Sequence, residues 1–170
     1  MKNTNLITVM LLALLLQSCW FIDSEEIEEP DPTSSLYEPI YLSREIFDTA
    51  VQLKNTIPIN TSGKIYIKDN LLFINEVNKG FHVYDNSDPS NPKAIRFLET
   101  LGATDLAIRN NMIYINQATD LIALEYNQTE NTINLTKRIP NTFPELLSPD
   151  GFYANNIPAN SVVIDWKLKN

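Results

Sequence analysis

Cysteine, glycine, histidine and basic side chains are all scarce in this chain. It has one cysteine, four glycines and one histidine, and 21 acidic residues against 13 basic ones give a formal charge of −8. One cysteine excludes a disulfide within the chain, and one histidine, His82, excludes a metal site with several histidine ligands. The acidic balance argues against nucleic acid as a partner, because such binding needs a basic surface. No phosphate-cradling loop and no Gly-x-Ser-x-Gly elbow occurs, so we predict no cofactor.

Residues 1–18 have the layout of an export signal. Lys2 is their only charged side chain, and residues 6–16 form an apolar run broken only by Thr8. That run is too short for a membrane-spanning helix, which needs about 20 residues, and it fits the apolar region of a signal peptide. The string Leu-Gln-Ser-Cys that ends at Cys19 resembles the lipobox of bacterial lipoproteins.

We therefore predict a lipoprotein signal peptide at residues 1–18 and lipid on Cys19, which makes a membrane the first partner of this chain. Each buried methylene of an acyl chain contributes about 0.8 kcal/mol, so several chains on one residue hold a protein firmly. The alternative is an ordinary secretory signal followed by a stray thiol.

Residues 19–36 are predicted to be an acidic, flexible tether, because a segment rich in Glu, Asp, Pro and Ser cannot bury enough apolar surface to fold alone. The acidic cluster at 23–29 resembles the signal that sends Bacteroidota lipoproteins to the outer face of the outer membrane. We expect lipid anchoring at the outer membrane, with exposure on the cell surface. The alternative is that the cluster is simply a solvated linker.

Residues 37–170 are predicted to form one all-β domain, because short alternating runs of Ile, Val, Phe and Tyr are separated by Asn- and Asp-containing turns. The predicted strands cover residues 64–68, 71–75, 80–85, 105–108, 112–116 and 120–125. Residues 70–75 match 111–116 at an offset of 41. A period near 40 with several strands in each unit is typical of propeller blades.

The fold class expected is therefore two propeller-blade-like antiparallel repeats, at about 63–100 and 103–140, followed by a cap at 141–170. Ser43 is a good helix N-cap, and residues 43–53 are predicted to form a short helix that places Ile46, Phe47, Ala50 and Val51 on one face. The β-branched residues 161–166 are predicted to be an edge strand that pairs with an otherwise open edge.

The run KIYIKDNLLFINEVNKGFHVYDNSDPSNPKAIRFL, with GATDLAIRNNMIYINQATDLIAL after it, resembles the LVIVD-type repeats of Bacteroidota envelope lipoproteins. The resemblance covers roughly residues 37–170. It implies propeller-like sheets and no specific activity, since such proteins are mostly uncharacterised. Two repeats are too few for a closed propeller, which takes about four to eight blades. Either the chain ends cap the sheets, or copies associate through the open edges.

Candidate chemistry rests on a few side chains. His82 faces away from both Phe81 and Val83, which favours a surface or stacking role over catalysis. Asp85, Asn86, Ser87 and Asp88 have oxygens for calcium but lack the EF-hand spacing, which favours turn capping, and we predict no metal site. Asp48-Thr49-Ala50 resembles a short O-glycosylation site of exported Bacteroidota proteins, which marks Thr49.

Two classes of function follow from these features. We favour a non-catalytic binding or scaffold module at the cell surface, which presents loops and aromatic residues to a protein or a glycan. The alternative is a small envelope hydrolase that uses paired carboxylates. The acids near predicted strand ends are Glu76, Asp85, Asp88, Asp105, Asp120 and Glu125, and the candidate aromatic contacts are Phe81, Tyr84, Tyr114, Phe152 and Tyr153. For the aromatic residues in strands, core packing is the competing interpretation.

Overall fold

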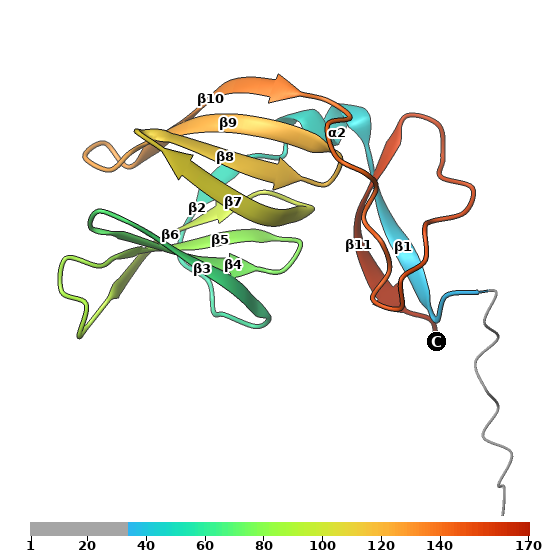
Figure 1. The fold of residues 1–170 in the computed structure, drawn as a ribbon, viewed down its shortest axis with the longest axis horizontal. Coiled ribbons are helices and arrows are strands. Elements are labelled where there is room, and N and C mark those ends of the chain that lie inside the picture. The colour runs from blue at the N-terminus through green and yellow to red at the C-terminus, as the bar shows by residue number, and fades with distance from the viewer. Residues whose placement is uncertain (1–33) are drawn as a thin grey trace, which may run out of the picture. The chain divides into compact units, whose positions relative to one another are not determined.

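The computed structural model describes residues 34–170, and Figure 1 shows them as a chain of strands with one short helix. The predicted all-β class is confirmed. The elements are β1 (Tyr37–Ser43), α2 (Arg44–Thr49), β2 (Gln52–Lys54), β3 (Ser62–Lys68), β4 (Leu71–Glu76), β5 (Gly80–Asp85), β6 (Lys93–Glu99), β7 (Ala103–Arg109), β8 (Met112–Gln117), β9 (Asp120–Asn127), β10 (Thr132–Ile139) and β11 (Ser161–Leu168). The predicted signal peptide and Cys19 lie outside the described residues.

In residues 34–170 the strands form three antiparallel sheets. One has five strands in the order β2-β6-β5-β4-β3, one has four in the order β10-β9-β8-β7, and β1 pairs with β11 in the third. Within this part of the chain no helix is long and apolar enough to cross a bilayer.

The two larger sheets follow one hairpin plan. Asp69 and Asn110, with φ of 52° and 54°, occupy the same place in the β3–β4 and β7–β8 turns, 41 positions apart in the numbering. Asp and Asn tolerate this left-handed conformation because their short polar side chains bond locally. The turns therefore start β4 and β8 at matching positions, and the two hairpins have the same register.

The main core lies between the five-stranded and the four-stranded sheet, which stack face to face in Figure 1. Phe73, Phe81, Val83 and Leu98 enter it from the five-stranded sheet. Leu106, Ile113, Ile115, Ile122 and Leu124 enter it from the four-stranded sheet. Strand alternation produces this separation, since every second side chain of a strand faces the other sheet.

The predicted helix at 43–53 is wrong in its length. Ser43 is the N-cap, as predicted, and accepts a hydrogen bond from the Ile46 backbone N–H at 3.5 Å, but the helix ends at Thr49. Phe47 and Ala50 are buried, whereas Ile46 is exposed. The chain then extends as β2, which pairs with β6 and lets Leu53 pack against the core. Tertiary burial of a β-branched and apolar stretch has overridden the helical pattern.

The predicted C-terminal strand is present as β11, and its partner is the N-terminal strand. β11 pairs with β1, from Tyr37 opposite Leu168 to Ser43 opposite Ser161. A smaller core attaches this two-stranded sheet to α2 and the β8–β9 turn, and it consists of Phe47, Ala118, Val162 and Ile164. The sheet therefore closes one end of the domain.

The last residues of the predicted tether are fixed in place. Asp150 accepts hydrogen bonds from the Ser35 hydroxyl and from the Leu36 backbone N–H, both at 2.7 Å. The Lys169 backbone N–H donates to the Leu36 carbonyl at 3.0 Å. Ser35 and Leu36 therefore contact the domain although they precede β1.

Candidate functional site

A cleft of about 640 Å³ opens between the two larger sheets, at the end where the β3–β4, β7–β8 and β9–β10 turns lie. Its volume falls within the range of about 300–1,000 Å³ that is usual for small-molecule sites. The two sheets converge toward the core and diverge at this end, so the cleft is a wedge with an apolar floor and a polar rim.

The rim consists mainly of amide side chains. Asn110 and Asn111 belong to the β7–β8 turn, Asn127 ends β9 and Gln128 follows it, and Asn134 lies on β10. An amide offers one acceptor and two donors, so such a rim can bond to hydroxyl or peptide groups of a ligand. Lys68, Asp69, Glu125 and Glu130 add charges of both signs.

One rim turn is held in shape by its own side chain. The Asn127 Oδ1 accepts hydrogen bonds from the backbone N–H groups of Thr129 and Glu130, at 3.0 and 3.1 Å. Asn131 follows with a φ of 56°. The Asn-rich composition therefore shapes the turn as well as furnishing polar groups.

The floor of the cleft is apolar, with Phe73 and Ile113 at its deepest part. Tyr126 packs its ring on the core and donates its hydroxyl proton to the Asn131 Oδ1 at 3.1 Å. Burial raises the pKa of Tyr126, against a smaller opposing effect of Arg96. Tyr126 therefore stays neutral at physiological pH and presents a hydrogen-bonding ring at the wall of the cleft.

No protein-family model, no curated protein and no solved structure matches this chain. What the protein does must therefore be argued from its own side chains.

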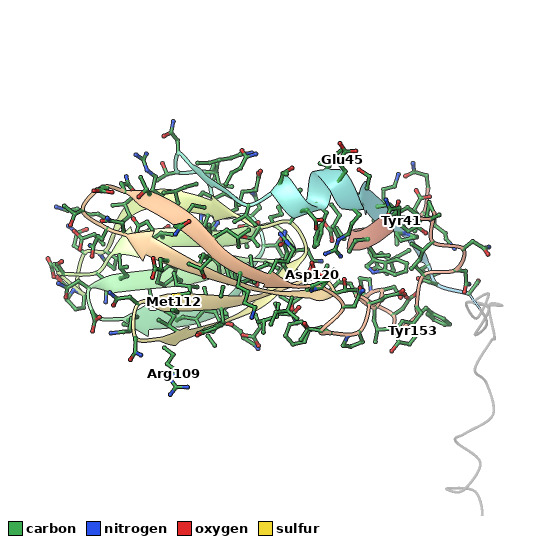
Figure 2. The ribbon with its side chains drawn as sticks, turned by 90° about the horizontal axis from the view of Figure 1, so that it is seen from above. Tyr41, Glu45, Arg109, Met112, Asp120 and Tyr153 are labelled. Atoms are coloured by element: carbon green, nitrogen blue, oxygen red, sulfur yellow. The ribbon has the colours of Figure 1, made fainter. Side chains whose placement is uncertain are left out.

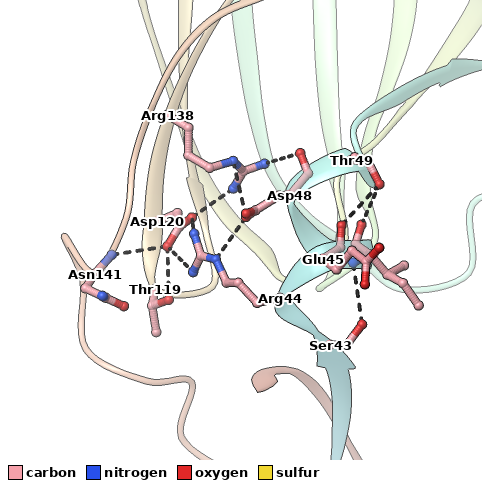
Figure 3. Close-up of polar contacts among 10 residues, drawn as sticks. Ser43, Arg44, Glu45, Asp48, Thr49, Thr119, Asp120, Arg138 and Asn141 are labelled. Carbon is pink, nitrogen blue, oxygen red and sulfur yellow. Dashed lines mark hydrogen bonds and ion pairs between the residues drawn. The ribbon is translucent and has the colours of Figure 1, made fainter. Parts of the chain in front are cut away.

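Asp120 forms a second polar centre (Figure 3), and a second pocket, of about 630 Å³, is lined by its neighbours Arg44 and Arg138. Its side chain is fully buried and accepts hydrogen bonds from Arg44 Nη1 at 3.0 Å, from Arg138 Nη1 at 2.9 Å and from the Asn141 backbone N–H at 3.2 Å. The Thr119 hydroxyl is also 3.2 Å away. Burial alone would raise the pKa of Asp120, but these hydrogen bonds lower it below the ordinary value. Asp120 is therefore a stable anion.

The two arginines also enclose an aromatic ring. The guanidinium carbons of Arg44 and Arg138 lie 5.3 and 5.2 Å from the centre of Phe47. Asp48 pairs with Arg44 Nε at 2.9 Å. A cation over an aromatic face is attracted by the ring quadrupole. The cluster therefore fastens α2 to the four-stranded sheet and acts as a structural joint.

Glu76 and His82 form a buried pair on the other sheet. The Glu76 carboxylate accepts hydrogen bonds from the backbone N–H groups of Asn60 and Thr61, at 3.0 and 2.8 Å, and lies 2.9 Å from His82 Nε2. The His82 ring stacks at a tilt on Phe97, with 5.0 Å between centroids. Burial would raise the pKa of Glu76, but the hydrogen bonds lower it. His82 thus stacks in the interior and is not a surface residue.

The remaining acids bind separate partners. Asp85 accepts from the Ser87 hydroxyl and backbone N–H, at 2.6 and 2.9 Å, and Asp88 accepts from those groups of Ser90, at 2.6 and 3.0 Å. Asp85 and Asp88 therefore cap turns, which is the interpretation that the sequence favours over calcium binding. Among residues 34–170, no group of three or more His, Cys, Asp or Glu side chains could hold a metal ion.

Asp105 joins the two sheets. It binds the Lys64 ammonium at 2.6 Å and the Tyr66 hydroxyl. Burial would raise the pKa of Asp105, but these bonds lower it. Burial and the bond to Asp105 raise the pKa of Tyr66 to about 12.

The other predicted residues lie apart from one another. Phe81 is a core residue and Tyr84 and Tyr114 are partly buried on strands, whereas Tyr153 is exposed in the loop before β11. Thr49 is exposed at the end of α2, and its hydroxyl donates to the Ile46 carbonyl at 3.1 Å. The cleft itself was missed, although its Asn-rich turns are visible in the sequence, because the sequence does not show which turns meet.

Proposed function

We propose that this protein is an outer-membrane lipoprotein, anchored through lipid on Cys19, that works as a non-catalytic binding module for an envelope glycan. The observation that carries the binding role is the wedge-shaped cleft, with five amide side chains around an apolar floor. Lipid anchoring rests on the lipobox-like string before Cys19 and on the acidic segment after it.

The chemistry of the cleft supports a glycan over a charged or apolar ligand. Sugars present neighbouring hydroxyl groups, and an amide can donate to one and accept from another. The Tyr126 ring has an apolar face for the C–H side of a sugar and a polar tip. Two of the candidate hydrolase acids are already paired, since Asp105 holds Lys64 and Asp120 holds two arginines.

Binding and turnover can be measured together. The full chain, and a variant with Asn111→Ala and Asn134→Ala, would be assayed against an array of envelope polysaccharides for affinity and for release of reducing ends. We expect binding without turnover in the wild type. Each lost hydrogen bond costs about 0.5–1.5 kcal/mol, so the double variant should bind about 5- to 150-fold more weakly.

A matched control is Asn155→Ala, which removes an exposed amide from the loop before β11. It should bind like the wild type. Turnover that disappears in Asp105→Asn or Glu125→Gln would instead support the hydrolase. Equal affinity of the wild type and the double variant would place binding elsewhere on the surface.

Membrane placement has its own test. Cells fed labelled palmitate should label the wild type, and Cys19→Ser should carry no label and leave the membrane fraction. Protease added to intact cells should digest the wild type if it faces outward. A wild-type protein that stays intact while a known surface lipoprotein is digested would exclude exposure on the cell surface.

A further inference from the structure

The outer face of the five-stranded sheet exposes aliphatic side chains in a row. Ile65 and Ile67 on β3 are 62% and 66% exposed. Ile65 pairs across to Ile74 and Ile67 to Leu72, and these neighbours lead on to His82 and Tyr84 of β5. Residues that are directly opposite in a sheet point to the same side. We call these six residues, Ile65, Ile67, Leu72, Ile74, His82 and Tyr84, the Ile67 face. Its His82 end is buried within the chain, so the open part lies at the two isoleucines of β3.

The same positions are buried in the second repeat. In the four-stranded sheet, Leu106 pairs with Ile115 and Ile115 with Ile122, while Ile108 pairs with Ile113 and Ile113 with Leu124. Matched through the turns at Asp69 and Asn110 for the first two strands and through the cross-strand pairs for the third, these six residues replace the Ile67 face one for one. All six belong to the core or pack against it.

On the other side of each sheet the relationship is reversed, because the positions that face the core in the first repeat face away from it in the second. Tyr66, Phe73 and Val83 pair in line and face the core in the first repeat. Their counterparts in the second repeat are Ala107, Tyr114 and Ala123, which share the side of the sheet opposite to Ile113, although Ala123 is itself buried. Met112 and Leu121 share this outer side, and Figure 2 labels Met112 on it. We call these five residues the Tyr114 face.

We call the side of each sheet that carries Tyr66 or Tyr114 its front, and the side that carries Ile67 or Ile108 its back. The two repeats therefore pack front to back. The front of the first repeat lies against the back of the second, so the chain leaves one unused back, the Ile67 face, and one unused front, the Tyr114 face. An interface of this heterologous kind can be repeated by further copies and closes into a ring when the rotation allows.

We propose that a second copy of this chain places its Tyr114 face on the Ile67 face of the first and so repeats the contact that already exists between the sheets. The row of isoleucines retains the aliphatic character of its buried counterpart, although it is solvated in the single chain. Two copies would supply four sheets and three copies six, which falls within the about four to eight blades of closed propellers.

Charge supports the same pairing. Within the chain, Lys64 of the first repeat meets Asp105, the residue at its own position in the second repeat. Between copies, Asp105 of one chain would come beside Lys64 of the next. Opposite charges would therefore meet between copies as they do between the two sheets of one chain.

Mixed cysteine cross-linking tests the joint directly. Lys64→Cys and Asp105→Cys would be made in separately tagged full chains, each in a Cys19→Ser background, co-expressed and oxidised. We expect a disulfide-linked pair that carries both tags. Either variant alone should give no covalent dimer, because the joint brings residue 105 to residue 64 and never to itself. Ser90→Cys combined with Asp105→Cys is the control and should stay unlinked.

A charge on the exposed face tests the strength of the association. Ile67→Glu should weaken self-association of the purified full chain by at least about tenfold in sedimentation velocity, because the joint would bury a carboxylate. Leu168→Glu is the matched control, since Leu168 is 61% exposed on the separate two-stranded sheet. It should assemble like the wild type, and circular dichroism should show that both variants remain folded.

Four results would overturn the proposal. The first three are a wild type that is monomeric at every concentration, a mixed pair with no cross-link, and self-linked Lys64→Cys chains, which would indicate a symmetric contact between two identical faces. The fourth is an assembly unaffected by Ile67→Glu, because it would place the contact elsewhere.

Discussion

Gly80 and Asp120 occupy the same position in the two repeats, since Gly80 pairs with Glu76 and Asp120 with Gln117. A side chain is excluded at the first position and makes several hydrogen bonds at the second. At Gly80 a Cβ atom would lie 2.1 Å from the Leu98 carbonyl oxygen. At Asp120 the carboxylate binds two arginines and accepts a hydrogen bond from the Asn141 backbone N–H.

Asp120→Asn should lower the free energy of unfolding by about 3–5 kcal/mol, because it leaves two partly buried arginines without their shared counter-charge. Urea denaturation followed by circular dichroism measures this loss. Asp48→Asn is the control, since Asp48 is 44% exposed and pairs with the same arginines. Its cost should be at most about 1 kcal/mol. Equal losses in the two variants would show that Asp120 does not hold this joint.

Gly80→Ala should destabilise the domain by about 1–3 kcal/mol from backbone strain alone, because Gly80 has a φ of 140° and no space for a methyl group. Gly151→Ala separates strain from the clash. Gly151 also has a positive φ, of 89°, but nothing lies within 4 Å of the place that an added methyl group would take. The thermal midpoint should fall further for Gly80→Ala than for Gly151→Ala. The reverse order would contradict the close approach of β6 to Gly80.

Acid should destabilise the domain through Asp120 and Glu76. Both have a pKa below the ordinary value in the folded protein. The stability that each contributes is complete above the unfolded pKa of about 4 and is lost as the pH falls through the folded pKa. Unfolding free energies measured at decreasing pH should decline for the wild type and less steeply for Asp120→Asn. Parallel curves would contradict the assignment to Asp120.

Asp150 should titrate at a pKa of about 2. Burial raises this pKa, but hydrogen bonds from Ser148, Ser35 and the Leu36 N–H lower it more strongly. An NMR titration of the carboxyl carbon measures the value directly. Ser148→Ala removes the bond at 2.5 Å and should move the pKa upward. An Asp150 that titrates at the ordinary value in the wild type would show that Ser35 and Leu36 are free of the loop.

Much of the fold could be predicted from the sequence, because its signals are local. Alternating apolar residues set the strands, and the Asp69-Asn70 and Asn110-Asn111 pairs set the turns. The helix ends earlier than predicted because β2 pairs with β6 and Leu53 packs against the core. This could not be predicted locally, since β6 lies far along the chain. The partner of β11 could not be found either. Its pattern predicts a strand, but nothing in it distinguishes the edge of a repeat from β1.

The candidate site was harder to predict than the fold. The Asn-rich turns were visible as turns, but the cleft depends on three of them meeting at one end of two stacked sheets. Likewise, the matching patterns of Ile67 and Ile108 predict two similar strands. They do not show that Ile108 packs against the core while Ile67 is solvated, because that depends on where the series of sheets stops.

The pairing of Tyr37 with Leu168 gives the domain a directional response to mechanical load. Tension between residues 34 and 170 would peel β1 from β11 one pair at a time, which takes little force. Tension between residue 34 and an object held at the cleft would instead run along β1 into Arg44, where it meets the buried Asp120. A domain held at residue 34 would therefore unfold easily when the force acts on residue 170 and resist when the force acts at the cleft.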